Sequence, residues 1–143
     1  MREALKEAKK GWHDGEIPVG ALSIGQSNEI LARDHNRCIS LNDPTAHAEI
    51  LVIRQAAKLL ENYRLNELSI VVTIEPCPMC MGAIINARLD MLVFGAFDPK
   101  SGAVGSICNL SDDLRLNHRL KVIPGIMEKE CRELMQEFFR ERR

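Results

Sequence analysis

The segment at residues 69–74, Ser-Ile-Val-Val-Thr-Ile, constrains the possible folds of this chain more than any other feature of its sequence. It is an unbroken run rich in β-branched residues, which is typical of a strand buried on both faces of a sheet. A second apolar run at residues 91–95 has the same character, and residues 76–87 between them have the composition of a buried helix. The pattern therefore predicts two interior strands that run parallel and are joined by a helix.

Shorter segments extend this unit on both sides. Residues 18–24 and 29–33 flank a turn at 25–28, which predicts a hairpin before the central strand. Small polar residues and a proline at 42–45 predict the start of a helix that ends near residue 62. The other predicted elements are an amphipathic helix that ends near residues 11–15, a loop at 97–118, a short strand at 120–123 and a closing helix with apolar residues at 127, 131, 134, 135 and 138. This order predicts an α/β domain with three α/β/α layers, whose central mixed five-stranded sheet begins antiparallel and continues parallel.

Composition and charge narrow the function. The chain has 143 residues, of which 45% are hydrophobic, and this suits one globular domain spanning residues 1–143. Its formal net charge of −1 argues against a protein that coats nucleic acid through a broad basic surface. The apolar runs are much shorter than the ~20 residues of a membrane span, and the charged N-terminus does not resemble a signal peptide. We therefore expect a cytoplasmic protein without a membrane partner.

The cysteines indicate a site and not a set of disulfides. There are five, which is an odd number, and no secretion signal accompanies them. A disulfide framework is therefore not expected. Cys77 and Cys80 have the spacing Cys-x-x-Cys, which indicates metal binding or redox chemistry. Cys38, Cys108 and Cys131 are interpreted as thiols without a ligand role.

Two short segments carry the residues with catalytic potential, Thr-Ala-His-Ala-Glu at 45–49 and Glu-Pro-Cys-Pro-Met-Cys at 75–80. Each is predicted at the first turn of a helix, and the second directly follows the buried strand, where open α/β sheets place their sites. The positive end of a helix stabilises thiolates and disfavours imidazolium, so we expect ionised Cys77 and Cys80 and a neutral His47. One imidazole and two thiolates leave one position of a tetrahedral metal open, which is the catalytic pattern of zinc.

Glu49 follows His47 by two residues. On a helix this offset turns its side chain by about 200°, so the two residues would not ligate a metal from the same face. Glu49 could, however, reach water on the metal, whose pKa zinc lowers to roughly 7, and transfer its proton. We therefore assign Glu49 to proton transfer, and His47, Cys77 and Cys80 to a zinc site.

Each of these residues alone has a less specific interpretation. An isolated Cys-x-x-Cys motif could be redox-active or a pair of buried thiols, and an isolated histidine at a helix start is more often a surface or core residue. Glu49 alone could be a first-turn acid that the helix dipole favours. These less specific interpretations hold together only if all three coincide in this order and spacing. The combination therefore favours a catalytic metal site. His-x-Glu followed by Pro-Cys-x-x-Cys is the known signature of zinc-dependent nucleobase deaminases.

Longer stretches around both motifs resemble one family. Asn-Asp-Pro-Thr-Ala-His-Ala-Glu-Ile at 42–50 and Glu-Pro-Cys-Pro-Met-Cys-Met-Gly-Ala at 75–83 resemble the bacterial tRNA-specific adenosine deaminases, members of the cytidine/deoxycytidylate deaminase superfamily. Purine deaminases of the guanine deaminase type share much of both stretches. Residues 94–106, 117–119 and 137–143 favour the tRNA-specific family, because they resemble its substrate loop and its closing segment.

This resemblance implies a cytidine-deaminase-like fold and the hydrolytic conversion of adenosine to inosine at wobble position 34 of a tRNA anticodon. It implies one zinc ion per subunit, held by His47, Cys77 and Cys80, with activated water attacking C6 of adenine and Glu49 as the proton shuttle. It also implies a homodimer in which the second subunit helps to build the RNA-binding surface. The substrate partner it implies is a tRNA anticodon stem-loop, and no DNA partner is expected.

Three further residues match substrate-binding positions of the family. Asn36 matches a residue that hydrogen-bonds the flipped nucleotide, although it could also be a turn-forming asparagine. Asp98 and Lys100 match loop positions beside the bound nucleotides, although they could also belong to a capped surface turn. Two other functions remain open, namely a small-molecule purine deaminase of the guanine type and a non-catalytic zinc- or nucleic-acid-binding module.

Overall fold

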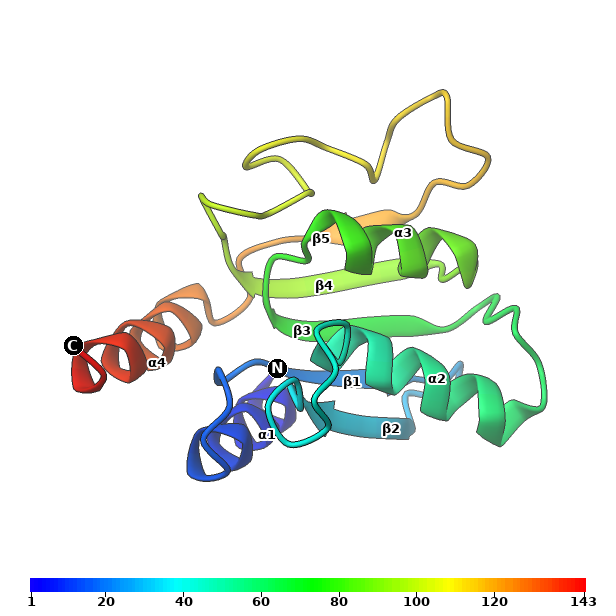
Figure 1. Ribbon diagram of the computed structural model, residues 1–143. Helices are drawn as coiled ribbons and strands as arrows, with labels where there is room; N and C mark the ends of the chain where they lie inside the picture. The colour runs from blue at the N-terminus through cyan, green and yellow to red at the C-terminus, as the bar shows by residue number, and fades with distance from the viewer.

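A computed structural model describes residues 1–143 and contains four helices and five strands (Figure 1). No helix combines the length and the apolar character that a membrane span requires. In chain order the elements are α1 (Arg2–His13), β1 (Gly20–Ile24), β2 (Ile30–His35), α2 (Ala48–Leu60), β3 (Ser69–Ile74), α3 (Pro78–Asn86), β4 (Met91–Ala96), β5 (Lys121–Ile123) and α4 (Glu128–Glu141).

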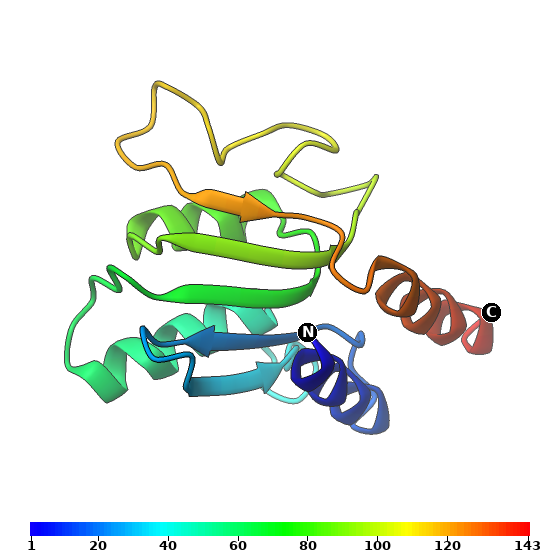
Figure 2. The same ribbon diagram turned by 180° about the vertical axis from the view of Figure 1, so that it is seen from behind.

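The strands form one mixed sheet with the order β2-β1-β3-β4-β5. β1 pairs antiparallel with both β2 and β3, whereas β3, β4 and β5 run parallel. Helices α2 and α3 cover one face of the sheet (Figure 1), and α1 and α4 lie on the other face (Figure 2). The predicted three-layer α/β/α fold and the change from antiparallel to parallel pairing are therefore confirmed.

The two faces of the sheet are packed differently. Nineteen buried residues, among them Ile70, Leu92 and Phe94, form one apolar cluster between the sheet and α2 and α3. The clusters on the α1 and α4 face contain three buried residues each. There α1 lies very close to β1. A Cβ atom at Gly20 would be only 2.0 Å from the carbonyl oxygen of Ala4. Only glycine at this strand position leaves room for α1.

Helix α2 begins later than the sequence predicts. The small polar residues at 42–45 form a turn, in which the Asp43 carboxylate accepts hydrogen bonds from the backbone N–H and the hydroxyl of Thr45, at 2.8 and 2.7 Å. The helix itself begins at Ala48. The N–H of Ala48 donates a hydrogen bond of 2.8 Å to Oδ1 of Asn36, which follows β2. A residue that is distant in sequence therefore satisfies the first amide of α2.

Candidate active site

The starts of α2 and α3 lie against each other and carry the predicted metal ligands. His47 and Cys77 occupy the N-cap positions of α2 and α3, and both have extended backbone. Cys80 lies in the first turn of α3, after Pro78. Proline suits a first helical turn because its fixed φ angle matches the helix and its missing N–H has no partner to lose there.

The three predicted ligands lie within coordinating distance of one point. The Nδ1 atom of His47 is 3.4 Å from the sulfur of Cys80 and 3.7 Å from the sulfur of Cys77. All three donor atoms lie within 4.8 Å of one another. Tetrahedral zinc with ordinary bond lengths separates a nitrogen ligand from a sulfur ligand by about 3.6 Å. The donor set therefore fits a zinc ion in both its chemistry and its spacing.

The three donors shift one another's pKa values. The hydrogen bond from Cys80 lowers the pKa of Cys77 to about 4, whereas the same contact with Cys77, together with burial, raises the pKa of Cys80. The hydrogen bond with Cys77 also raises the pKa of His47. At these short distances each shift comes mainly from the nearest donor. Ionised thiols and a neutral imidazole are the forms that bind a metal, and a divalent cation would displace the protons that these groups hold. The predicted protonation therefore stays a prediction for the metal-bound site.

Glu49 lies beside the predicted metal ligands, in the first turn of α2. It is 3% exposed, and burial raises the pKa of its carboxyl group to about 7. A carboxyl group that is buried next to a candidate metal site and lines a cavity is suited to receive and return a proton.

A cavity of about 310 Å³ lies against these groups. Its volume is at the lower end of the range for small-molecule sites. All the predicted site residues except the buried Cys80 line it. The lining residues are Ile17, Val19, Asn36, His47, Glu49, Ile74, Glu75, Cys77, Asp98, Lys100, Ser101, Met135 and Phe139.

Asn36 has its two polar atoms in different environments. Its oxygen accepts the hydrogen bond from Ala48, so that the NH₂ group is the part that can donate to a ligand in the cavity. A ligand at this wall therefore needs an acceptor, such as a ring nitrogen of a purine. The side chain that satisfies the start of α2 therefore also lines the cavity.

Asp98 and Lys100 follow β4 and line the cavity together. The carboxylate of Asp98 accepts hydrogen bonds from the backbone N–H groups of Lys100 and Ser101, at 3.0 and 3.3 Å. The capped turn that the sequence leaves open as an alternative is therefore present, and it forms part of the cavity wall. The two interpretations of this segment do not exclude each other.

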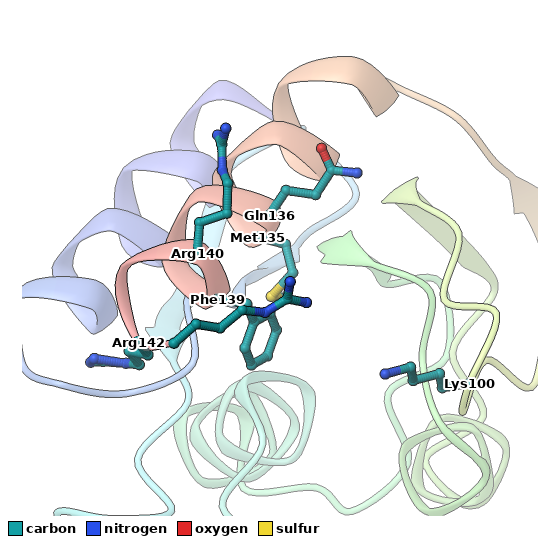
Figure 3. Close-up of a pocket in the computed structure, with 7 residues that line it drawn as sticks. Lys100, Met135, Gln136, Phe139, Arg140 and Arg142 are labelled. Atoms are coloured by element: carbon teal, nitrogen blue, oxygen red, sulfur yellow. The ribbon is translucent and has the colours of Figure 1, made fainter.

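A second hollow of about 570 Å³ adjoins the cavity, between α4 and Lys100 (Figure 3). Both hollows are lined by Lys100, Met135 and Phe139. Phe139 is 45% exposed, and it offers an aromatic surface that the sequence analysis missed. The spacing of Met135 and Phe139, four residues apart on one helix face, is the signal that could have identified them. The remaining lining residues of this hollow are Gln136, Arg140, Arg142 and Arg143.

The other close donors in the molecule do not form a second site. Glu7, Asp34 and His35 are buried within 4.8 Å of one another, but Lys10 pairs with Glu7 at 2.7 Å and Arg37 with Asp34 at 2.7 Å. The three remaining cysteines are unpaired and lie apart from the metal ligands; they are Cys38, Cys108 and Cys131.

The order of this mixed sheet, with one imidazole and two thiols at the starts of two helices, defines the cytidine-deaminase-like class of proteins. The sequence profile of the MafB19-like deaminases matches residues 1–143. The chain belongs to this family and, within it, to the tRNA-specific adenosine deaminases. The tRNA-specific adenosine deaminase of Bacillus subtilis is 47% identical over 143 residues, which are 100% of this chain and 88% of that relative.

Solved structures support the same placement. The structure of a tRNA:A34 deaminase, studied for A-to-I editing at the wobble position of transfer RNA, is 42% identical, with a TM-score of 0.90 over 94% of this chain and 96% of that one. The guanine deaminase of Bacillus subtilis is 39% identical, with a TM-score of 0.64 over 67% of this chain and 61% of that one. This guanine deaminase matches a smaller part of the molecule, whereas that of Nitrosomonas europaea, 22% identical, covers 96% of this chain with a TM-score of 0.84. The guanine-type fold is therefore related over nearly the whole chain.

Proposed function

We propose that this protein converts adenosine to inosine at wobble position 34 of a tRNA anticodon by hydrolytic deamination. The observation that carries this proposal is the convergence of His47, Cys77 and Cys80 beside a cavity that Glu49 also lines. Membership of the tRNA-specific adenosine deaminases supports the substrate class, since relatives that are 41–47% identical over the whole length of this chain carry that name.

His47, Cys77 and Cys80 would hold one zinc ion per subunit, because their chemistry and spacing fit that ion. Bound zinc supplies Lewis acidity and lowers the pKa of water to roughly 7. Three ligands from the protein match the usual composition of a catalytic zinc site, whereas structural zinc sites usually have four.

Glu49 is the group that moves protons in this proposal. Deamination forms a bond between a water oxygen and C6 of adenine and breaks the bond between C6 and the amino nitrogen. Glu49 takes a proton from the attacking water and gives it to ring nitrogen N1. It then carries the proton of the new hydroxyl group to the amino nitrogen, so that ammonia leaves and a carbonyl remains at C6. Burial of Glu49 keeps these protons from exchanging with bulk water.

Other residues that line the cavity would bind the nucleotide. The NH₂ group of Asn36 would donate to an acceptor of the purine, and Asp98 and Lys100 would lie beside the neighbouring nucleotides. The adjoining hollow has four cationic residues in its lining, Lys100, Arg140, Arg142 and Arg143. Cations there suit the phosphates of a polynucleotide, and a free base would leave them unused. This difference favours RNA over a free purine.

The experiment that tests the proposal offers three substrates to the zinc-loaded protein. A tRNA(Arg) anticodon stem-loop, free guanine and cytidine are incubated separately, and the products are followed by mass analysis and ammonia release. We expect inosine at position 34 of the stem-loop and no ammonia from the two small molecules. Ammonia from guanine alone would replace the proposal with a free-base purine deaminase, and no product from any substrate would indicate a non-catalytic binding module.

We also propose that residues 1–143 form one domain and that the protein acts as a homodimer in the cytoplasm. The resemblance to the tRNA-specific family implies the dimer, and exposed apolar side chains near the end of α2, Leu59, Leu60 and Tyr63, offer surface that a second copy could cover. Sedimentation equilibrium should give twice the chain mass of 16.1 kDa. A mass equal to one chain at micromolar concentration would contradict the dimer.

A further inference from the structure

Glu75 is a buried acid that the proposed reaction does not use. It directly follows β3 and lies two residues before Cys77. It is 2% exposed, and it takes part in none of the ion pairs of the molecule. A buried carboxylate without a cation must obtain its stabilisation from hydrogen-bond donors.

All side-chain hydrogen bonds of Glu75 come from the segment at residues 98–106. Its Oε2 atom accepts from the N–H of Asp98 at 2.9 Å and from the hydroxyl of Ser106 at 2.5 Å. Its Oε1 atom accepts from the N–H groups of Val104 and Ser106, at 2.9 and 3.1 Å. One carboxylate therefore binds both ends of the segment that contains Lys100.

The main chain strengthens this connection. The N–H of Glu75 donates to the carbonyl of Ala96, and the N–H of Ala103 donates to the carbonyl of Pro76, both at 2.8 Å. A Cβ at Gly102 would lie 2.2 Å from the carboxyl carbon of Glu75. The segment can pass over the carboxylate at this distance only because residue 102 has no side chain.

We propose that Glu75 is a positioning residue that holds the 98–106 segment in the place where Asp98 and Lys100 face the cavity. Because Glu75 also begins the stretch that leads into Cys77, it sets the nucleotide-binding wall at a fixed distance from the proposed metal ligands. The inference rests on the proposed function, which assigns Asp98 and Lys100 to nucleotide binding.

Glu75→Gln is the direct test, because it keeps the shape of the side chain and changes its hydrogen bonding. Whichever way the amide is turned, its NH₂ group faces at least one backbone N–H of the segment, and two donors cannot form a hydrogen bond with each other. We expect KM for the anticodon stem-loop to rise roughly tenfold or more, kcat to change by less than about threefold and bound zinc to stay at one ion per chain.

Two further variants accompany the kinetic test: one should have a smaller effect than Glu75→Gln, and the other is a control. Ser106→Ala removes one of the four donors and leaves the backbone ones, so its KM should rise by only about twofold to fivefold. Glu29→Gln is the control for loss of a glutamate charge, since Glu29 accepts the N–H of Ser27 at 2.9 Å in the exposed turn before β2. Its KM and kcat should equal those of the wild type.

Amide hydrogen exchange gives a readout that does not depend on activity. In Glu75→Gln, the N–H groups of Asp98, Val104 and Ser106 should exchange roughly tenfold to a hundredfold faster, because each loses a charge-assisted hydrogen bond. The rest of the sheet should exchange at the wild-type rate, which separates local loosening from global destabilisation.

Glu16→Gln is the matched control for exchange. Glu16 is also 2% exposed, and its carboxylate accepts the N–H groups of Ile39 and Ser40 at 3.1 and 2.7 Å. Exchange should increase at these two amides in Glu16→Gln and stay unchanged in the segment at 98–106. The two variants should therefore loosen different loops.

The outcomes separate the inference from the proposed function. Unchanged exchange at 98–106 in Glu75→Gln, or loss of zinc or of kcat with an unchanged KM, would overturn the positioning role. If the wild-type protein fails to deaminate the stem-loop, the proposed function is wrong, and the exchange experiment still decides whether Glu75 holds the segment.

Discussion

The two sides of the cavity are built by different means. The metal side consists of residues at the starts of α2 and α3, which the nineteen-residue apolar cluster holds against the sheet. The opposite side consists of a loop after β4 and of α4, a helix in which only Cys131 and Phe138 are buried. Glu49 is 3% exposed, whereas Phe139 across the cavity is 45% exposed. We infer that the rigid side serves the reaction and that the exposed side serves recognition.

This comparison predicts that substitutions on the metal side abolish the reaction. Cys80→Ala leaves two of the three metal ligands, so we expect no bound zinc after dialysis and no detectable inosine in the stem-loop. Elemental analysis and mass analysis of the RNA measure both. Cys108→Ala removes an exposed thiol and should retain one zinc ion and full activity. A Cys80→Ala protein that keeps zinc and activity would contradict the ligand assignment.

Asn36 contributes to both sides of the cavity, because it accepts the first N–H of α2 and also lines the cavity. Two variants separate these contributions. Asn36→Asp keeps an acceptor for the N–H of Ala48 but loses the NH₂ donor, and we expect kcat/KM to fall roughly tenfold to a hundredfold through the lost contact with the purine. Asn36→Ala loses the cap as well, and the free energy of unfolding should fall by a further ~0.5–2 kcal/mol.

Steady-state kinetics and urea unfolding measure the two effects of Asn36. Wild-type kcat/KM in Asn36→Asp would show that the side chain serves only as a helix cap. Equal stability of both variants would show that the hydrogen bond to Ala48 contributes little.

The smallest effects are expected on the recognition side. Lys100→Ala should raise KM by about threefold to tenfold and leave kcat unchanged, because one phosphate contact is lost. Binding of the stem-loop should depend only weakly on salt, with a slope of log K against log salt no steeper than about −3, since about four cations line the adjoining hollow. Lys129→Ala, on the exposed face of α4, is the control and should change neither value. A much steeper slope would indicate a broad electrostatic interface.

The sequence predicts the interior strands of the fold well, because burial on both faces requires an unbroken run of apolar residues. Residues 69–74 form β3 as predicted, and the apolar run at 91–95 lies within β4. The start of α2 was misplaced, because the polar residues at 42–45 satisfy a turn and the cap of Ala48 comes from Asn36, twelve residues earlier. Local propensity contains no information on a cap of this kind.

The same distinction applies to the site. His47, Cys77 and Cys80 could be predicted as a group because ligand spacing within each motif is local, and the structure brings them together. Phe139 could not, because its place in the cavity depends on how α4 lies against the sheet. The contacts of Glu75 depend in the same way on the path of a loop that has no regular pattern.

The most direct test of the proposed active site combines two measurements on Glu49→Ala. Bound zinc is determined on the same preparation that is used for single-turnover deamination of the anticodon stem-loop. We predict one zinc ion per chain and a rate of inosine formation lower by at least about a hundredfold, up to roughly ten-thousandfold, because the proton carrier is gone while the metal ligands remain. Inosine formation near the wild-type rate by the zinc-loaded variant would contradict the assignment of Glu49.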